Sequence, residues 1–66
     1  MNIMINDKNY IVADELTLMT LIEKLTLPQS GSVFAVNEQI IAKQYWDRTR
    51  LNDGDHISLF QVIAGG

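Results

Sequence analysis

The 66-residue chain contains no cysteine, one histidine and one proline. Without cysteine it can form neither a disulfide nor a thiolate nucleophile, and a single histidine rules out a histidine-rich metal site. No apolar run approaches the roughly 20 residues of a membrane span. The chain has five basic and eight acidic residues, and its net charge of −3 argues against nucleic-acid binding, which requires a basic patch.

Size and hydrophobic content predict one small folded domain. A chain of this length has room for a single core and buries about 60% of its unfolded surface, and a hydrophobic fraction of 47% is typical of globular proteins. The opening residues, 1–4, carry no basic segment of the kind that begins a signal peptide. We therefore expect a cytoplasmic protein, whose acidic surface favours a basic protein partner.

Residues 1–13 predict a β-hairpin. Ile3 and Ile5 alternate with residues on the other side of a half-buried strand, and the Asn- and Asp-containing sequence that follows is turn chemistry. The next run is rich in β-favouring residues, and we expect its Tyr10 and Val12 to face inward.

A helix is predicted next. Thr17 is the expected N-cap, and the helix should run to about Thr26, because Pro28 prevents simple continuation. One apolar face repeats at helical spacing and indicates plain core packing; it consists of Leu18, Leu21, Ile22 and Leu25.

The second half predicts three further strands, at 33–36, 40–42 and 56–62. A tight turn at 52–55 precedes the last strand, since Asp-Gly is a strong turn pair, whereas 43–50 shows no clean period. One helix can cover only one face of a small sheet. We therefore predict an α+β fold of the β-grasp, or ubiquitin-like, type, with a mixed four- to five-stranded sheet packed on one main helix.

Groups for catalysis or metal binding are few. His56 follows Asp55, but neighbours on a strand point to opposite faces, so a surface histidine is favoured over a catalytic base. Asp53 and Asp55 suggest a calcium loop, yet the twelfth position counted from Asp53 is Ala64, where an EF-hand requires a glutamate. We predict no catalytic residue and no metal site.

The last strand predicts a docking surface. Ile57 and Leu59 share the face that we assign to the core, so Phe60 and Val62 point outward and form an apolar patch for a partner. The alternative is that this face is covered by the aromatic side chains of the irregular segment, Tyr45 and Trp46.

The sequence closes with Gly65-Gly66, directly after this apolar strand. Glycine lacks a Cβ, so such a tail can thread a narrow channel and present its α-carboxylate. We divide the chain into a β-grasp domain, residues 1–62, and a flexible tail, residues 63–66. On the tail alone, a terminus without a function is an equally open interpretation.

Several stretches along the whole chain together resemble the ThiS family of sulfur carrier proteins in thiamine biosynthesis. They are the ending 60–66, the opening 1–6, the capped helix from Thr17, Val36-Asn37 followed by Ile40, Trp46, and the Asp53-Gly54-Asp55 turn. The length is also typical of that family. The charge pattern of residues 43–50 is a mild departure, which we cannot relate to that family.

The resemblance implies a carrier rather than an enzyme. Its C-terminal Gly66, at the end of the tail Ala64-Gly65-Gly66, would be adenylated by the E1-like adenylyltransferase ThiF with ATP and magnesium. A cysteine desulfurase or sulfurtransferase system would then supply sulfur to form a thiocarboxylate, and thiazole synthase, ThiG, would accept it. Phe60, Val62 and Ile63 would dock on these partners, and the chain itself would hold no cofactor.

Two other functions stay open. The molybdopterin carrier MoaD shares the fold and the Gly-Gly ending, although it is usually longer and resembles this chain less along its length. A ubiquitin-like interaction module would bind a partner non-covalently or be joined to a lysine.

Overall fold

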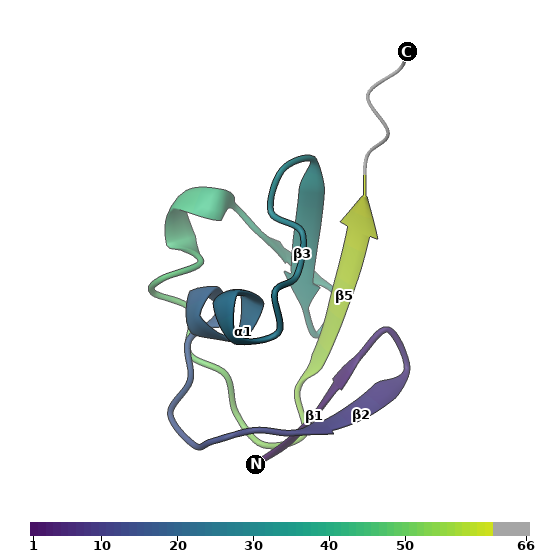
Figure 1. The fold of residues 1–66 in the computed structure, drawn as a ribbon, viewed down its shortest axis with the longest axis vertical. Helices are drawn as coiled ribbons and strands as arrows, with labels where there is room; N and C mark the ends of the chain where they lie inside the picture. Colours follow the sequence, from purple (N-terminus) through teal and green to yellow (C-terminus); the bar gives the residue numbers. More distant parts are fainter. Residues whose placement is uncertain (62–66) are drawn as a thin grey trace.

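The computed structural model describes residues 1–61, and its strand and helix order confirms the predicted α+β class (Figure 1). The elements are β1 (Asn2–Ile5), β2 (Lys8–Ile11), α1 (Leu18–Lys24), β3 (Ser32–Val36), β4 (Gln39–Ile41), the short 3-10 helix Lys43–Tyr45, and β5 (His56–Gln61). Within that part of the chain, no helix is long and apolar enough to cross a membrane.

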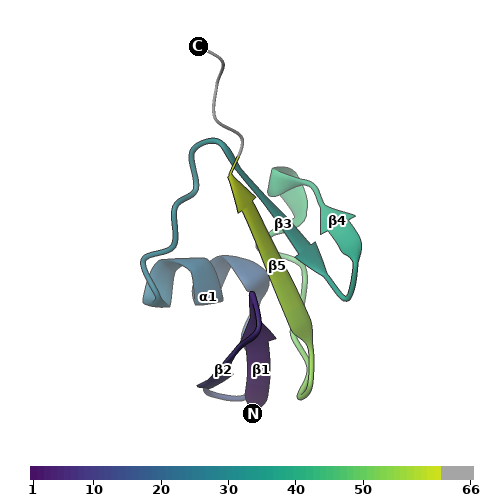
Figure 2. The same ribbon diagram turned by 90° about the vertical axis from the view of Figure 1, so that its right-hand side faces the viewer.

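The five strands form one mixed sheet in the order β2-β1-β5-β3-β4. β1 and β5 run parallel, whereas the other neighbouring strands are antiparallel. Helix α1 packs on one face of the sheet and leaves the opposite face open (Figure 2). The last strand in the sequence therefore occupies the centre of the sheet, between the first strand and β3.

Both hairpins turn through a pair of residues in the left-handed backbone region. Asn6 and Asp7 have φ angles of 47° and 69°, and Asn37 and Glu38 have angles of 50° and 71°. Each pair is the two-residue loop of its hairpin, and positive φ at both central positions is the mark of a type I′ turn. Asparagine tolerates this region better than most residues, which explains its place at the head of each turn.

The predicted facing of the first hairpin is confirmed. Tyr10 and Val12 pack against the core, whereas the intervening Ile11 is 85% exposed. This alternation follows from the strand period of two.

Helix α1 begins where the sequence predicts and ends slightly earlier. The hydroxyl of Thr17 accepts a hydrogen bond from the backbone N–H of Thr20 at 3.2 Å, so Thr17 is the N-cap. The helix ends at Lys24 instead of about Thr26, because Thr26 adopts a left-handed φ of 52°. The N–H groups of Thr26 and the next residue bond back to the last helical turn, which is a Schellman ending.

The core lies between α1 and the covered face of the sheet. Its buried members are Ile3, Ile5, Leu16, Leu18, Leu21, Ile22, Phe34, Trp46, Leu51 and Ile57. Trp46 is 2% exposed, meets the Phe34 ring edge-on at a centroid distance of 5.0 Å, and donates its indole N–H to the Ile41 carbonyl at 3.1 Å. The segment 43–50, which has no sequence period, is thus held by Trp46 in the core and by backbone hydrogen bonds from Leu18 and Met19 to its carbonyls.

Candidate functional site

The candidate site begins with β5, because this strand directly precedes the predicted tail. Ile57 lies beside Ile5 of β1, and the same strand pairs on its other side with β3 from Val36 to Ser32. A central strand with neighbours on both sides provides a rigid base for the segment that follows it. The predicted tail, residues 63–66, and the boundary after residue 62 lie outside the described residues.

The predicted facing of β5 is confirmed. Ile57 is 1% exposed and Leu59 packs against the core, whereas Phe60 is 56% exposed. Phe60 lies opposite Val33 of β3 on the face away from α1. The predicted docking residues Val62 and Ile63 lie outside the described residues.

The alternative in which Tyr45 and Trp46 cover the outer face is wrong for the tryptophan. Trp46 packs against Phe34, whose cross-strand partner Leu59 faces the core. Its ring is therefore on the side of the sheet opposite Phe60. Tyr45 is 48% exposed, and Phe60 keeps more than half of its surface open to solvent.

A shallow depression of about 300 Å³ lies beside Phe60. It is lined by residues 56–60 of β5 together with Met4, Asn6 and Asp7. Met4 and Phe60 thus belong to one surface that joins β1 to the end of β5. The depression combines an apolar thioether and ring with an amide and a carboxylate, a composition suited to a protein contact.

His56 and Asp55 do not form a catalytic pair. His56 is exposed, whereas Asp55 is 8% exposed and points into the protein. The alternation of adjacent strand residues separates the two side chains, as the sequence predicts. Among residues 1–61, no group of three histidine, cysteine, aspartate or glutamate side chains is placed to hold a metal ion.

The carboxylate of Asp55 instead organises the start of β5, a role that the sequence did not indicate. One oxygen accepts a hydrogen bond from the Asn37 amide at 3.0 Å, and the other accepts from the backbone N–H of Asn52 at 2.7 Å. The Asn37 amide oxygen accepts in turn from the backbone N–H of His56 at 3.0 Å. A buried carboxylate with several donors is well satisfied, and it fixes the turn 52–55 to the β3–β4 hairpin.

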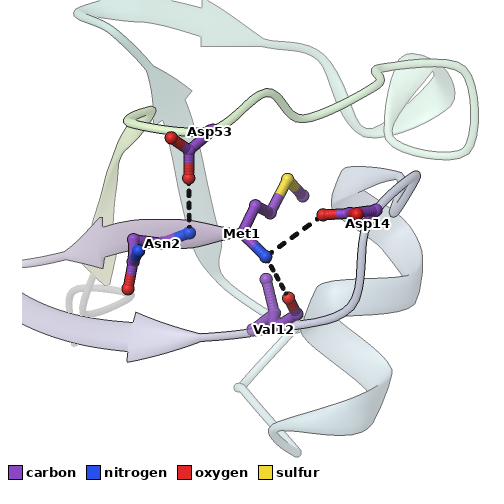
Figure 3. A network of polar contacts seen from close by, with 5 residues as sticks. All are labelled: Met1, Asn2, Val12, Asp14 and Asp53. Atoms are coloured by element: carbon purple, nitrogen blue, oxygen red, sulfur yellow. Dashed lines mark hydrogen bonds and ion pairs between the residues drawn. The ribbon is translucent and has the colours of Figure 1, made fainter.

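The neighbouring Asp53 fixes the same turn to β1 (Figure 3). Its carboxylate accepts a hydrogen bond from the backbone N–H of Asn2 at 2.6 Å. In the same network, the amine of Met1 donates to the Val12 carbonyl at 2.6 Å and to the exposed Asp14 carboxylate at 3.2 Å. The acidic residues of the turn therefore act as structural anchors.

A further polar contact holds β5 near its end. The Asn6 side chain accepts a hydrogen bond from the Leu59 N–H at 2.9 Å and donates one to the Leu59 carbonyl at 3.2 Å. These residues are 53 positions apart in the sequence. The turn pattern explains why position 6 is an asparagine, but it does not indicate that the Asn6 side chain also bonds Leu59.

Comparison with known proteins gives one consistent result. The ThiS family matches residues 3–66 of the chain. Over 66 residues the chain is 42% identical to the sulfur carrier protein ThiS of Escherichia coli (strain K12), with the full length of both chains covered.

Solved structures agree. The crystal structure of the thiamine biosynthesis protein (ThiS) from Geobacter metallireducens is similar with a TM-score of 0.89, at 26% identity and with 100% of both chains covered. The solution NMR structure of a thiamine biosynthesis protein from that organism gives a TM-score of 0.78, also at 26% identity, and covers 100% of this chain and 88% of that one. The agreement confirms the predicted β-grasp fold. From its sequence match and its fold together, the chain belongs to the ThiS family.

Proposed function

We propose that this chain, a sulfur carrier of the ThiS family, carries its sulfur as a thiocarboxylate on Gly66 and donates it for thiazole formation in thiamine biosynthesis. The observation that supports this site is the extent of the family match, which runs to residue 66 and so includes Gly65-Gly66. The relative from Escherichia coli, 42% identical over its full length, is itself named a sulfur carrier protein.

The chemistry starts from a poor electrophile. The α-carboxylate of Gly66 is ionised at neutral pH and resists nucleophilic attack. In the proposed sequence, the adenylyltransferase ThiF joins a carboxylate oxygen to the AMP portion of ATP, with magnesium, and pyrophosphate leaves. A persulfide sulfur from a cysteine desulfurase or sulfurtransferase system then displaces AMP. Reduction of the sulfur–sulfur bond by a thiol leaves the thiocarboxylate, which the thiazole synthase ThiG accepts.

The chain's own part in this chemistry is presentation. Among the described residues, no group of three histidine, cysteine, aspartate or glutamate side chains is placed to hold a metal ion. Residues 1–62 act in this proposal as a rigid platform, and residues 63–66 as the arm that enters the partner's active site. Side chains at positions 65 and 66 would crowd the place where acyl and phosphoryl groups meet, whereas glycine leaves room for them.

Docking is assigned to the outer end of β5. Phe60 is exposed beside a depression that also includes Met4, and an exposed aromatic residue is a common anchor in protein interfaces. We propose that Val62 and Ile63 extend this surface toward the tail. The partner would thus hold the carrier by its sheet face while the tail reaches the reacting groups.

Intact-mass measurement tests the proposal. The protein is incubated with the E1-like partner, ATP, magnesium and a sulfur donor, and the expected product has one oxygen replaced by sulfur at the C-terminus. Reactions without ATP, and a variant that lacks Gly66, should leave the mass unchanged. Sulfur incorporation that survives the deletion of Gly66 would overturn the assignment.

Two outcomes distinguish the remaining functions. A thiocarboxylate that ThiG does not accept would favour a molybdopterin-type carrier. A chain that binds a partner but never gains sulfur would favour a ubiquitin-like interaction module. The compared proteins are named for sulfur transfer and thiamine biosynthesis, which is why the first function is preferred. A cytoplasmic location stays a prediction.

A further inference from the structure

The Asn6 side chain forms hydrogen bonds with β5 just beyond the end of β1, where strand pairing stops. β1 ends at Ile5, and Asn6 turns the chain away with a φ of 47°. The Asn6 backbone N–H makes one last bond of the strand type, to the Ile57 carbonyl at 3.1 Å. Its side chain then bonds both the N–H and the carbonyl of Leu59, at 2.9 Å and 3.2 Å.

This contact substitutes for the missing strand neighbour. In a strand, every second residue directs its N–H and carbonyl to the same side, so Leu59 faces β1 as Ile57 does. A primary amide offers one acceptor and one donor, as a backbone residue of a neighbouring strand would. The Asn6 side chain therefore extends the β1–β5 ladder by one step beyond the end of β1.

After Leu59, the two sides of β5 differ. On one side β3 continues to pair, with Val33 opposite Phe60 and Ser32 opposite Gln61. On the other side, within residues 1–61, the Asn6 amide is the last group that bonds β5. A strand end that is held from one side frays more readily than one held from both.

We propose that Asn6 is a positioning residue for sulfur transfer, one that keeps the end of β5 ordered up to Gln61 and so gives the segment before Gly66 a fixed starting point. This proposal rests on the proposed function of Gly66. An ordered starting point limits the positions that the segment leading to Gly66 can take, and ordering that is established before the reaction raises its rate in the partner's active site.

The chain offers a matched control at the other hairpin. Asn37 heads the same kind of turn with a φ of 50°, and its side chain also makes two hydrogen bonds to the β5 segment, at Asp55 and His56. These contacts lie at the start of β5, whereas those of Asn6 lie near its end. Replacement by glycine keeps either turn unstrained and removes only the amide contacts.

The test compares Asn6→Gly with Asn37→Gly in the full chain. ¹⁵N relaxation and amide exchange report the order of Leu59, Phe60 and Gln61 without any sulfur chemistry. We expect Asn6→Gly to loosen these three residues, and Asn37→Gly to leave them ordered. Equal order of the three residues in wild type and Asn6→Gly would overturn the proposal.

Activity provides the second measurement. With the E1-like partner, kcat/KM for adenylation should fall about tenfold or more in Asn6→Gly and less than about twofold in Asn37→Gly. Equal losses in both variants would show general destabilisation and overturn the positioning role. If Asn6→Gly does not fold, Asn6→Asp keeps the acceptor for the Leu59 N–H and replaces the donor by a carboxylate oxygen that repels the Leu59 carbonyl, and the same comparisons apply. Failure of the wild type to be adenylated would instead overturn the proposed function.

Discussion

Replacing Phe60 by alanine separates two properties of one side chain, its contribution to folding and its contribution to partner binding. Phe60 is 56% exposed, so less than half of its apolar surface is buried in the folded domain. Complete burial of such a side chain is worth about 1.5–3 kcal/mol. We therefore expect Phe60→Ala to lower the free energy of unfolding by about 1 kcal/mol or less.

Phe34→Ala sets the scale for comparison. Phe34 is fully buried and packs edge-on against Trp46, so its truncation should cost about 3–5 kcal/mol. At about 0.05–0.15 kcal/mol per residue, the whole domain is stable by only about 3–10 kcal/mol. Urea unfolding followed by tryptophan fluorescence measures both variants. A loss of about 3 kcal/mol or more in Phe60→Ala would refute the assignment of the strand faces.

For partner binding, in contrast to stability, we expect Phe60→Ala to have a large effect. An aromatic anchor at the centre of an interface contributes about 2 kcal/mol or more, which is about thirtyfold in Kd. Calorimetric titration of Phe60→Ala with the E1-like partner should show this loss. Ile11→Ala is the matched control, since Ile11 is 85% exposed on the edge strand β2 and does not line the depression beside Phe60. If Phe60→Ala binds as tightly as Ile11→Ala, Phe60 is not a docking residue.

Two further substitutions test the supports of the platform. Thr17→Ala removes the acceptor of the Thr20 N–H and should cost about 1 kcal/mol; an unchanged urea midpoint would show that the cap contributes nothing. Asp55→Ala leaves the donors of Asn37 and Asn52 without their carboxylate and should cost about 1–3 kcal/mol. Thermal unfolding checks the second, and stability equal to the wild type would contradict the anchoring role of Asp55.

Local features of the fold were predictable from the sequence. The alternation of Ile57 and Phe60 identified the two faces of β5, and Thr17 identified the start of α1. Such patterns depend on the strand period, the helix period and capping chemistry, which act over a few residues. The end of α1 was less certain, because Thr26 adopts a backbone conformation that its residue type does not favour.

Features that depend on distant parts of the chain were not predictable. The irregular segment 43–50 shows no period because it is fixed by the buried Trp46 and by backbone hydrogen bonds to the start of α1, which is distant in the sequence. Asp55 belongs to a sequence typical of an exposed turn, yet its carboxylate is buried against a different hairpin. The hairpin turn alone accounts for an asparagine at position 6, so the local sequence pattern does not indicate the contact of Asn6 with Leu59.

The central place of β5 has a consequence for synthesis of the protein. Residues 56–61 are synthesised after β1 to β4, and until they are in place both strands that flank β5 have open edges. The sheet closes only through pairs between distant parts of the chain, which makes closure slow compared with helix formation. A chain interrupted before residue 56 lacks its middle strand and should be a substrate for proteolysis. A chain that lacks β5 also lacks the residues that follow it, so a partly synthesised carrier has neither a closed sheet nor the C-terminal glycines.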